Sequence, residues 1–294
     1  MKRILILIAI LFTLQITYAC DICGCSSGNY FIGPYPHFQN KFMGFRYTYR
    51  KFYSKVADEP EFSHDLYQTM EVWGGTTLGS RWQIMAFIPY NINHQLSDDE
   101  AHNKQGFGDI TLLASYQLFP FSGNVNKHQI WLAGGLKLPT GHFNPELGHD
   151  AIPSANMQPG TGSLDFIFNA NDVFFFDKWS LYSNAAYKLN GTAKDFRFGN
   201  RFSISSNLAR SLPANKVTFS PYLGLQYEHL DHNSYANEQL AETGGHALLA
   251  TAGMDVQLGK FNLGVNFQLP TTQNFSGKQT EIKSRGMVQL NFLF

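Results

Sequence analysis

Residues 261–269 read FNLGVNFQL, and their side chains alternate strictly between apolar ones and ones that are polar or glycine. Successive side chains of a β-strand point to opposite sides, so this stretch has one apolar and one polar face when extended. The same period of two recurs over residues 109–118 and 246–258. This pattern indicates strands with two unlike faces. A soluble β-sandwich also alternates, so alternation alone does not separate a soluble protein from a membrane protein.

Period-two alternation predicts twelve strands along the chain. They lie near residues 41–54, 65–78, 82–91, 107–119, 128–139, 163–176, 179–190, 196–210, 217–230, 245–258, 261–270 and 281–294. Short connections such as 79–81 and 259–260 alternate with long polar ones such as 92–106 and 140–162, and only 191–195 is short on the long side. An even number of strands with short turns at one end and long loops at the other is typical of a single-chain outer-membrane barrel.

The C-terminal strand and the aromatic residues support the same fold. Val288, Leu290, Phe292 and Phe294 alternate, and the chain stops on the last of them, which is similar to the sorting signature of outer-membrane barrels. Aromatic side chains gather near predicted strand ends, as the interfacial girdles of such barrels require. The sequence therefore predicts an all-β protein: a transmembrane antiparallel up-and-down β-barrel of twelve strands over residues 40–294, in the outer membrane of a Gram-negative-type cell.

The composition excludes several other classes of protein. Lys and Arg number 22 and offset 22 Asp and Glu, and only 15% of residues are charged, so the chain lacks the cationic surplus of a nucleic-acid binder. An aromatic content of 15% argues against disorder. No apolar run reaches the roughly 18 residues that a spanning helix needs.

The N-terminus carries the features of an export signal. Met1-Lys2-Arg3 is basic, residues 4–14 are apolar, and Thr17-Tyr18-Ala19 offers a cleavage site. The apolar run is too short to cross a bilayer, so residues 1–19 are predicted to be a signal peptide, with the mature chain starting at Cys20.

All three cysteines lie directly after this signal, at Cys20, Cys23 and Cys25. Four interpretations are open in an oxidising compartment. Cys20 could carry a lipid, Cys20 and Cys23 could form a disulfide, the three thiolates could hold copper or zinc, or the cluster could be structural.

Residues 20–39 form a Cys-rich periplasmic N-terminal segment, in which residues 26–39 hold four aromatic side chains. A tail this apolar is not expected to stay in water. We expect it to fold back into the barrel as a plug, and deleting 26–38 should then raise conductance. Residues 20–38 are also the candidate contact for a periplasmic partner.

The face opposite the apolar stripe is predicted to line the lumen. Its charged members are Arg46, Arg50, Glu71, Asp109, Lys137, Asp165, Lys188, Arg197, Arg201 and Asp255. Both signs are present, so no strongly ion-selective ring is expected. A barrel of this size lies between filled eight-stranded barrels and open porins, which predicts a partly obstructed pore for a small solute. The alternative is a filled barrel with a structural or partner-binding role.

Eight of the ten histidines fall in or beside the predicted outer loops, and the tightest group is His229-Leu230-Asp231-His232. Imidazoles at an outer mouth could capture transition-metal ions such as copper or zinc, with His229 and His232 as the candidate ligands. No histidine spacing matches a zinc-enzyme motif.

Three glycine-containing motifs lie at predicted strand ends: Gly106-Phe107-Gly108-Asp109-Ile110, Leu138-Pro139-Thr140-Gly141 and Gly160-Thr161-Gly162-Ser163. In combination they resemble the outer-membrane transporter family named for the meta-pathway of phenol degradation. The resemblance covers about residues 40–294 and leaves the Cys-rich segment outside. It implies a barrel with a transport role, the partners being outer-membrane lipid and a small solute, and it does not establish phenol as the cargo.

Twelve-stranded outer-membrane phospholipases supply a remote enzymatic alternative. They use a Ser–His pair on the barrel face, and here His142 or His149 with Ser154 and Asn156 are the candidates. This region departs from that pattern, because Pro145, Pro153 and Pro159 mark it as an irregular loop. We therefore predict that the chain is not an enzyme.

Overall fold

The computed structural model describes residues 41–55, 62–96, 101–119, 128–144 and 155–294. Twelve antiparallel strands form a closed barrel, which confirms the predicted fold class. The wall strands are β1 (Phe42–Lys55), β2 (Phe62–Leu78), β3 (Trp82–Leu96), β5 (Thr111–Phe119), β6 (His128–Lys137), β7 (Asp165–Phe176), β8 (Trp179–Leu189), β11 (Arg201–Arg210), β13 (Val217–Leu230), β16 (Gly245–Leu258), β17 (Phe261–Phe275) and β18 (Thr280–Leu293). Within the described residues, no helix is both long enough and apolar enough to cross a membrane.

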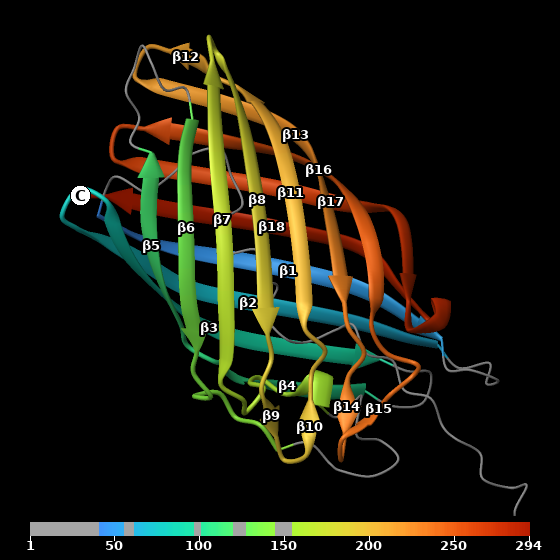
Figure 1. Cartoon of the computed structure of the whole chain (residues 1–294). Coiled ribbons are helices and arrows are strands. Elements are labelled where there is room, and N and C mark those ends of the chain that lie inside the picture. Colours follow the sequence, from blue (N-terminus) through green and yellow to red (C-terminus); the bar gives the residue numbers. More distant parts are fainter. Residues whose placement is uncertain (1–40, 56–61, 97–100, 120–127, 145–154) are drawn as a thin grey trace, which may run out of the picture.

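Each wall strand pairs with its sequence neighbour, and the first and last strands close the ring. β1 pairs with β18 from Phe42 opposite Leu293 onward. In Figure 1, β5 to β8 cross in front of β1, β2, β17 and β18, the opposite tilts expected of a barrel seen from the side. The tight turns lie at the end where the amide of Phe294 donates to the carbonyl of Lys41, and we call this the turn end.

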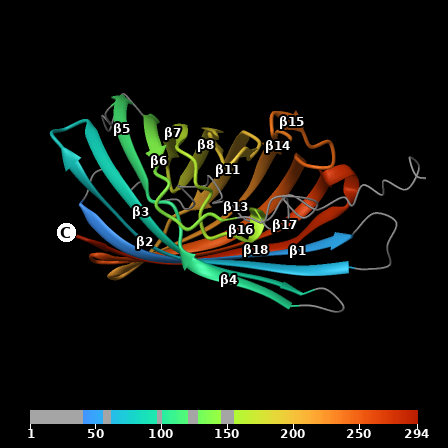
Figure 2. The same cartoon turned by 90° about the horizontal axis from the view of Figure 1, so that it is seen from below.

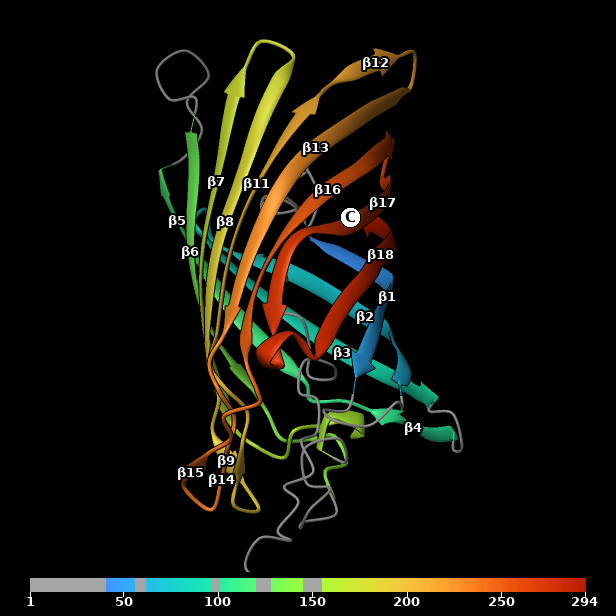
Figure 3. The same ribbon diagram turned by 90° about the vertical axis from the view of Figure 1, so that its right-hand side faces the viewer.

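The long connections gather at the opposite end, which we call the loop end. There β9 (Thr192–Ala193), β10 (Phe196–Arg197), β14 (Ser234–Tyr235) and β15 (Glu238–Gln239) form a separate four-stranded outer sheet. Figure 3 shows this outer sheet extending beyond the wall strands. β4 (Ala101–Phe107) lengthens the wall beside β3, β12 (Leu212–Ala214) pairs with β13, and the 3-10 turn η2 (Ser276–Lys278) joins β17 to β18.

The wall has its apolar side chains outside and its polar ones inside. On β17, Phe261, Val265 and Phe267 are exposed, whereas Asn262 and Asn266 are buried. This is the reverse of a soluble protein. It suits a barrel in lipid, where the outer face must be apolar and the closed ring pairs every strand edge.

The structure corrects three of the predicted boundaries. The expected loop 92–106 is largely the paired ends of β3 and β4. The expected strand 107–119 is broken at Gly108, whose amide donates to the carbonyl of Pro89 at 2.9 Å, so β4 and β5 are separate strands. The expected strand 196–210 is divided, because residues 196–197 join the outer sheet and the wall strand begins at Arg201.

Candidate functional site

The barrel interior is lined by polar and by aromatic side chains. On β13, β17 and β18 it carries buried amides, which we call the amide face: Gln226, Asn262, Asn266, Gln268, Gln289 and Asn291. The Gln268 amide donates to Gln226 Oε1 at 2.8 Å and to Thr251 Oγ1 at 3.0 Å, and the Asn291 amide donates to Asn262 Oδ1 at 3.2 Å. Amide groups offer both donors and acceptors, so the amide face can hydrogen-bond a polar solute or water.

Between β1 and β7, beside further buried amides such as Gln83 and Gln117, lies an aromatic and apolar cluster that we call the aromatic face. It joins β1, β2, β3, β5, β6 and β7 through the buried residues Phe42, Trp73, Met85, Phe87, Leu113, Trp131 and Ile167. The rings of Trp73 and Phe87 stack with centroids 5.7 Å apart, and the Arg46 guanidinium lies 5.2 Å from the Trp73 centroid. The interior therefore combines an aromatic surface with hydrogen-bonding groups, the usual composition of a small-molecule site.

The charges predicted to line the lumen lie on inward-facing positions, with one exception. Arg46, Arg50, Glu71, Asp109, Lys137, Asp165, Lys188 and Asp255 are buried, and Arg201 is partly buried. Arg46 forms an ion pair with Glu71 across β1 and β2. Arg197 is the exception. It lies in β10 of the outer sheet, is exposed, and hydrogen-bonds the carbonyl of Asn190, because the chain leaves the wall before residue 201.

Sequence reasoning missed a second interior ion-pair group. Glu228 of β13 is fully buried, with Oε2 2.7 Å from Arg201 Nη2 and Oε1 2.5 Å from Arg285 Nη2. Alternation could have found Glu228, because it shares the inward face of β13 with Gln226. Its link to Arg285 depends on β18 lying three strands from β13 around the closed wall, which no local pattern reveals.

The three glycine motifs meet at one place on the loop end. There Asp109, Lys137, Thr161, Ser163, Asp165 and Lys188 form a buried group that we call the rim network. Lys137 Nζ lies 2.6 Å from Asp109 Oδ2 and 2.9 Å from Asp165 Oδ2. The amides of Gly141 and Thr161 donate to Asp109 at 2.9 and 2.8 Å. Each carboxylate thus has a cation and backbone donors, which compensates for its burial.

Glycine is required where the motif backbones cross. A Cβ built on Gly141 would lie 2.8 Å from the backbone of both Gly108 and Gly160. A Cβ on Gly160 would lie 2.7 Å from the backbone of Gly141. The three backbones touch without side chains between them. The motifs therefore hold the β6–β7 connection against the rim of the wall. Within the rim network, every charged side chain already has an ion-pair partner.

Next to the rim network, residues 155–163 extend into the barrel, and we call them the inward loop. Seen from the loop end, residues 155–164, which come just before β7, run inside the curve of the wall (Figure 2). Asn91 and Asn93 of β3 donate to the carbonyls of Pro159 and Met157 at 2.7 and 2.9 Å. The Met157 side chain packs in an apolar cluster with Phe52, Tyr67, Ala247, Leu249, Phe275 and Ile282, which belong to five wall strands. The inward loop thus crosses the mouth of the barrel and narrows it.

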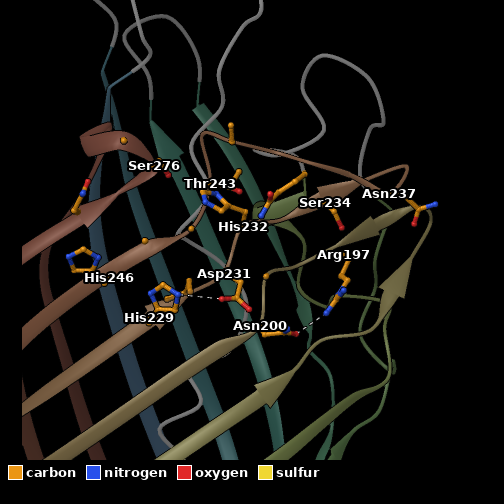
Figure 4. Close-up of a pocket in the computed structure, with 18 of the residues that line it drawn as sticks. Arg197, Asn200, His229, Asp231, His232, Ser234, Asn237, Thr243, His246 and Ser276 are labelled. Carbon is orange, nitrogen blue, oxygen red and sulfur yellow. Dashed lines mark hydrogen bonds and ion pairs between the residues drawn. The ribbon is translucent and has the colours of Figure 1, made fainter.

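A polar groove of about 810 Å³ lies outside this mouth, between the outer sheet and the ends of β13 and β16 (Figure 4). His229 and His246 are cross-strand partners there, and His229 Nε2 lies 3.3 Å from Asp231 Oδ1. The two predicted metal ligands, His229 and His232, both line the groove. In the described parts of the chain, no group of three or more His, Cys, Asp or Glu side chains could hold a metal ion.

Several predicted residues fall outside the described part of the chain. These are Cys20, Cys23, Cys25 and the segment 20–39, together with His149 and Ser154 of the phospholipase alternative. Of the remaining two residues of that alternative, His142 is exposed and Asn156 is buried in the inward loop.

A family model described as "Putative MetA-pathway of phenol degradation" matches residues 61–277. The match contains the rim network, the inward loop and the groove. The chain belongs to this family. Membership confirms the resemblance carried by the three glycine motifs, and the Cys-rich segment lies outside the matched span. No protein of curated function is similar enough in sequence to be matched to this chain.

Solved structures show the same architecture. An outer-membrane channel from Pseudomonas putida F1 superposes with a TM-score of 0.64 at 13% identity, covering 92% of this chain and 100% of that one. The β domain of the Bordetella autotransporter BrkA superposes with a TM-score of 0.54 at 12% identity, covering 87% of this chain and 100% of that one. At such identities the likeness concerns the fold. This family member has the fold of an outer-membrane β-barrel, as its sequence predicted.

Proposed function

We propose that this chain is an outer-membrane channel for a small solute, narrowed at its loop end by the inward loop. The supporting observation is that the two faces of the wall differ: the exterior is apolar and the interior is polar. The amides of the interior can replace water around a polar solute.

The inward loop sets the size of the solute. It reaches from the rim network to the far side of the mouth, where Met157 meets Phe52, Leu249 and Ile282. Only the space that this loop leaves is open to a solute, so the channel is expected to pass small molecules and to exclude large ones.

Liposome swelling tests this function with the full chain. Vesicles that contain the folded protein should swell in isosmotic glycerol faster than empty vesicles, and they should not swell in an isosmotic trisaccharide. Swelling no faster than in empty vesicles with either solute would contradict the proposal. Met43→Ala is a suitable control variant, because Met43 faces outward and is 56% exposed, so it should swell like the wild type.

We propose separately, from residue spacing, that Cys20, Cys23 and Cys25 bind copper or zinc. Protein purified anaerobically should contain near-stoichiometric metal by elemental mass spectrometry, and a variant with all three cysteines changed to Ser should contain none. Equal trace metal in both proteins would remove this proposal without affecting the channel.

A further inference from the structure

Asp255 differs from the interior carboxylates Glu71, Asp109, Asp165 and Glu228. It lies on β16, three positions before the strand ends at Leu258, so it faces the interior near the turn end. Its side chain is 1% exposed, and Oδ2 has no hydrogen-bond partner among the described residues. No described cation forms an ion pair with it, whereas Glu71, Asp109, Asp165 and Glu228 each have at least one.

The surroundings of Asp255 are polar and neutral. Asn262 and Gln289 of the amide face hydrogen-bond the Asp255 carboxyl group, and Tyr222 is beside it on β13. Its Oδ2 keeps no hydrogen-bond partner in the described chain. An unused carboxylate oxygen in a buried region is unfavourable unless something else binds to it.

A glycine makes room for this carboxylate. Gly264 of β17 lies opposite Asp255 in the β16–β17 register. A Cβ on Gly264 would lie 2.7 Å from Asp255 Oδ1 and 2.8 Å from Gln289 Nε2. Asp255 and Gln289 therefore both extend into the space above Gly264, which holds the carboxylate against the wall between two amides.

From this geometry we infer that Asp255 is a binding site for a monovalent cation, in particular for the protonated amine of a small solute. A buried carboxylate without a counter-charge is costly, and a bound ammonium group would compensate for it by a charge-assisted hydrogen bond to Oδ2. Amide oxygens and the Tyr222 hydroxyl are further acceptors for an ammonium group, which has only donors. A calcium ion takes about six to eight oxygen ligands, so a single carboxylate favours a monovalent cation.

This inference rests on the proposed function and specifies it. Short turns face the periplasm in bacterial barrels, so Asp255 would lie toward the periplasmic end of the pathway. A solute would first pass the inward loop and then meet the carboxylate. The site predicts a preference for cationic over anionic small solutes.

Calorimetric titration of methylammonium chloride into the folded full-length barrel tests the site directly. The wild type should bind methylammonium. Asp255→Asn, which keeps the shape and removes the charge, should weaken binding by at least about tenfold, because a charged acceptor gives roughly twice the hydrogen-bond strength of a neutral one. Gly264→Ala should also weaken binding, because its Cβ displaces the carboxylate without changing any charge.

Asp172→Asn is the matched control, because Asp172 faces outward on β7 and pairs with His128 at 2.9 Å. It should bind methylammonium like the wild type. Equal binding by the wild type and Asp255→Asn, or binding by neither, would overturn the inference. Ion conductance in a planar bilayer separates the two proposals: if Asp255→Asn loses methylammonium binding but no variant conducts, the site stands and the channel function fails.

Discussion

At the scale of single residues, the buried charges of the loop end hold the structure together. Lys137 is 1% exposed and is the cation that both Asp109 and Asp165 share. Lys137→Met should lower the free energy of unfolding by about 3–5 kcal/mol, the range for a buried ion pair that loses one partner. Urea unfolding in detergent micelles, followed by tryptophan fluorescence, measures this loss.

Lys283 supplies the comparison for Lys137. It pairs with Glu281 at 2.5 Å, but the two side chains are 51% and 49% exposed. Lys283→Met should therefore change the free energy of unfolding by only about 0–1 kcal/mol, as for most exposed pairs. Equal losses in the two variants would show that the rim network has no special structural role.

The glycine motifs make a second prediction at this scale. Gly141→Ala should lower the free energy of unfolding by about 1–3 kcal/mol, the usual cost of overpacking, because its Cβ meets two backbones. Gly134→Ala on β6 should be nearly neutral, since a Cβ there has nothing within 4 Å. Urea unfolding measures both variants. A Gly141→Ala protein as stable as Gly134→Ala would contradict the close contact between the backbones of the three glycine motifs.

At the scale of elements, the inward loop controls access to the interior. Met157→Ala shortens the side chain that seals against Phe52, Leu249 and Ile282, so the mouth should widen. Single-channel conductance should rise relative to the wild type, while Met43→Ala on the outer face should leave it unchanged. A conductance that falls or stays the same in Met157→Ala would show that the constriction lies elsewhere.

The sequence predicted the elements of the wall far better than those of the loop end. Alternation placed β17 and β18 on the correct faces because each side chain of a wall strand meets either lipid or the interior, which is a local property. The inward loop has no such period. Its position depends on Asn91 and Asn93, more than sixty residues earlier, and on apolar contacts with five other strands.

The glycine motifs show the same limit in another form. Sequence reasoning placed these motifs at predicted strand ends, and it assigned Asp109 to the lumen. In the structure the glycines of three motifs touch one another, and Asp109 accepts hydrogen bonds from two of the motifs. The motifs could be recognised as a set from the sequence, but their physical reason is a crossing of distant segments.

At the scale of the whole molecule, the orientation of the barrel follows from its ends. Short turns should face the periplasm and the outer sheet should face the outside of the cell. In a background without native cysteines, Glu238→Cys on the outer sheet should react with a membrane-impermeant maleimide in intact cells. Lys216→Cys in a tight turn should react only after the outer membrane is permeabilised. Both positions are exposed, so the reverse result would mean the opposite orientation.

The central claim is that the closed, polar-lined barrel conducts. The most direct test is single-channel recording of the purified full chain in a planar lipid bilayer. We expect discrete current steps, smaller than those of open porins because the inward loop narrows the mouth. A silent bilayer with the folded wild type and with Met157→Ala alike would contradict the account and leave a barrel with a structural role.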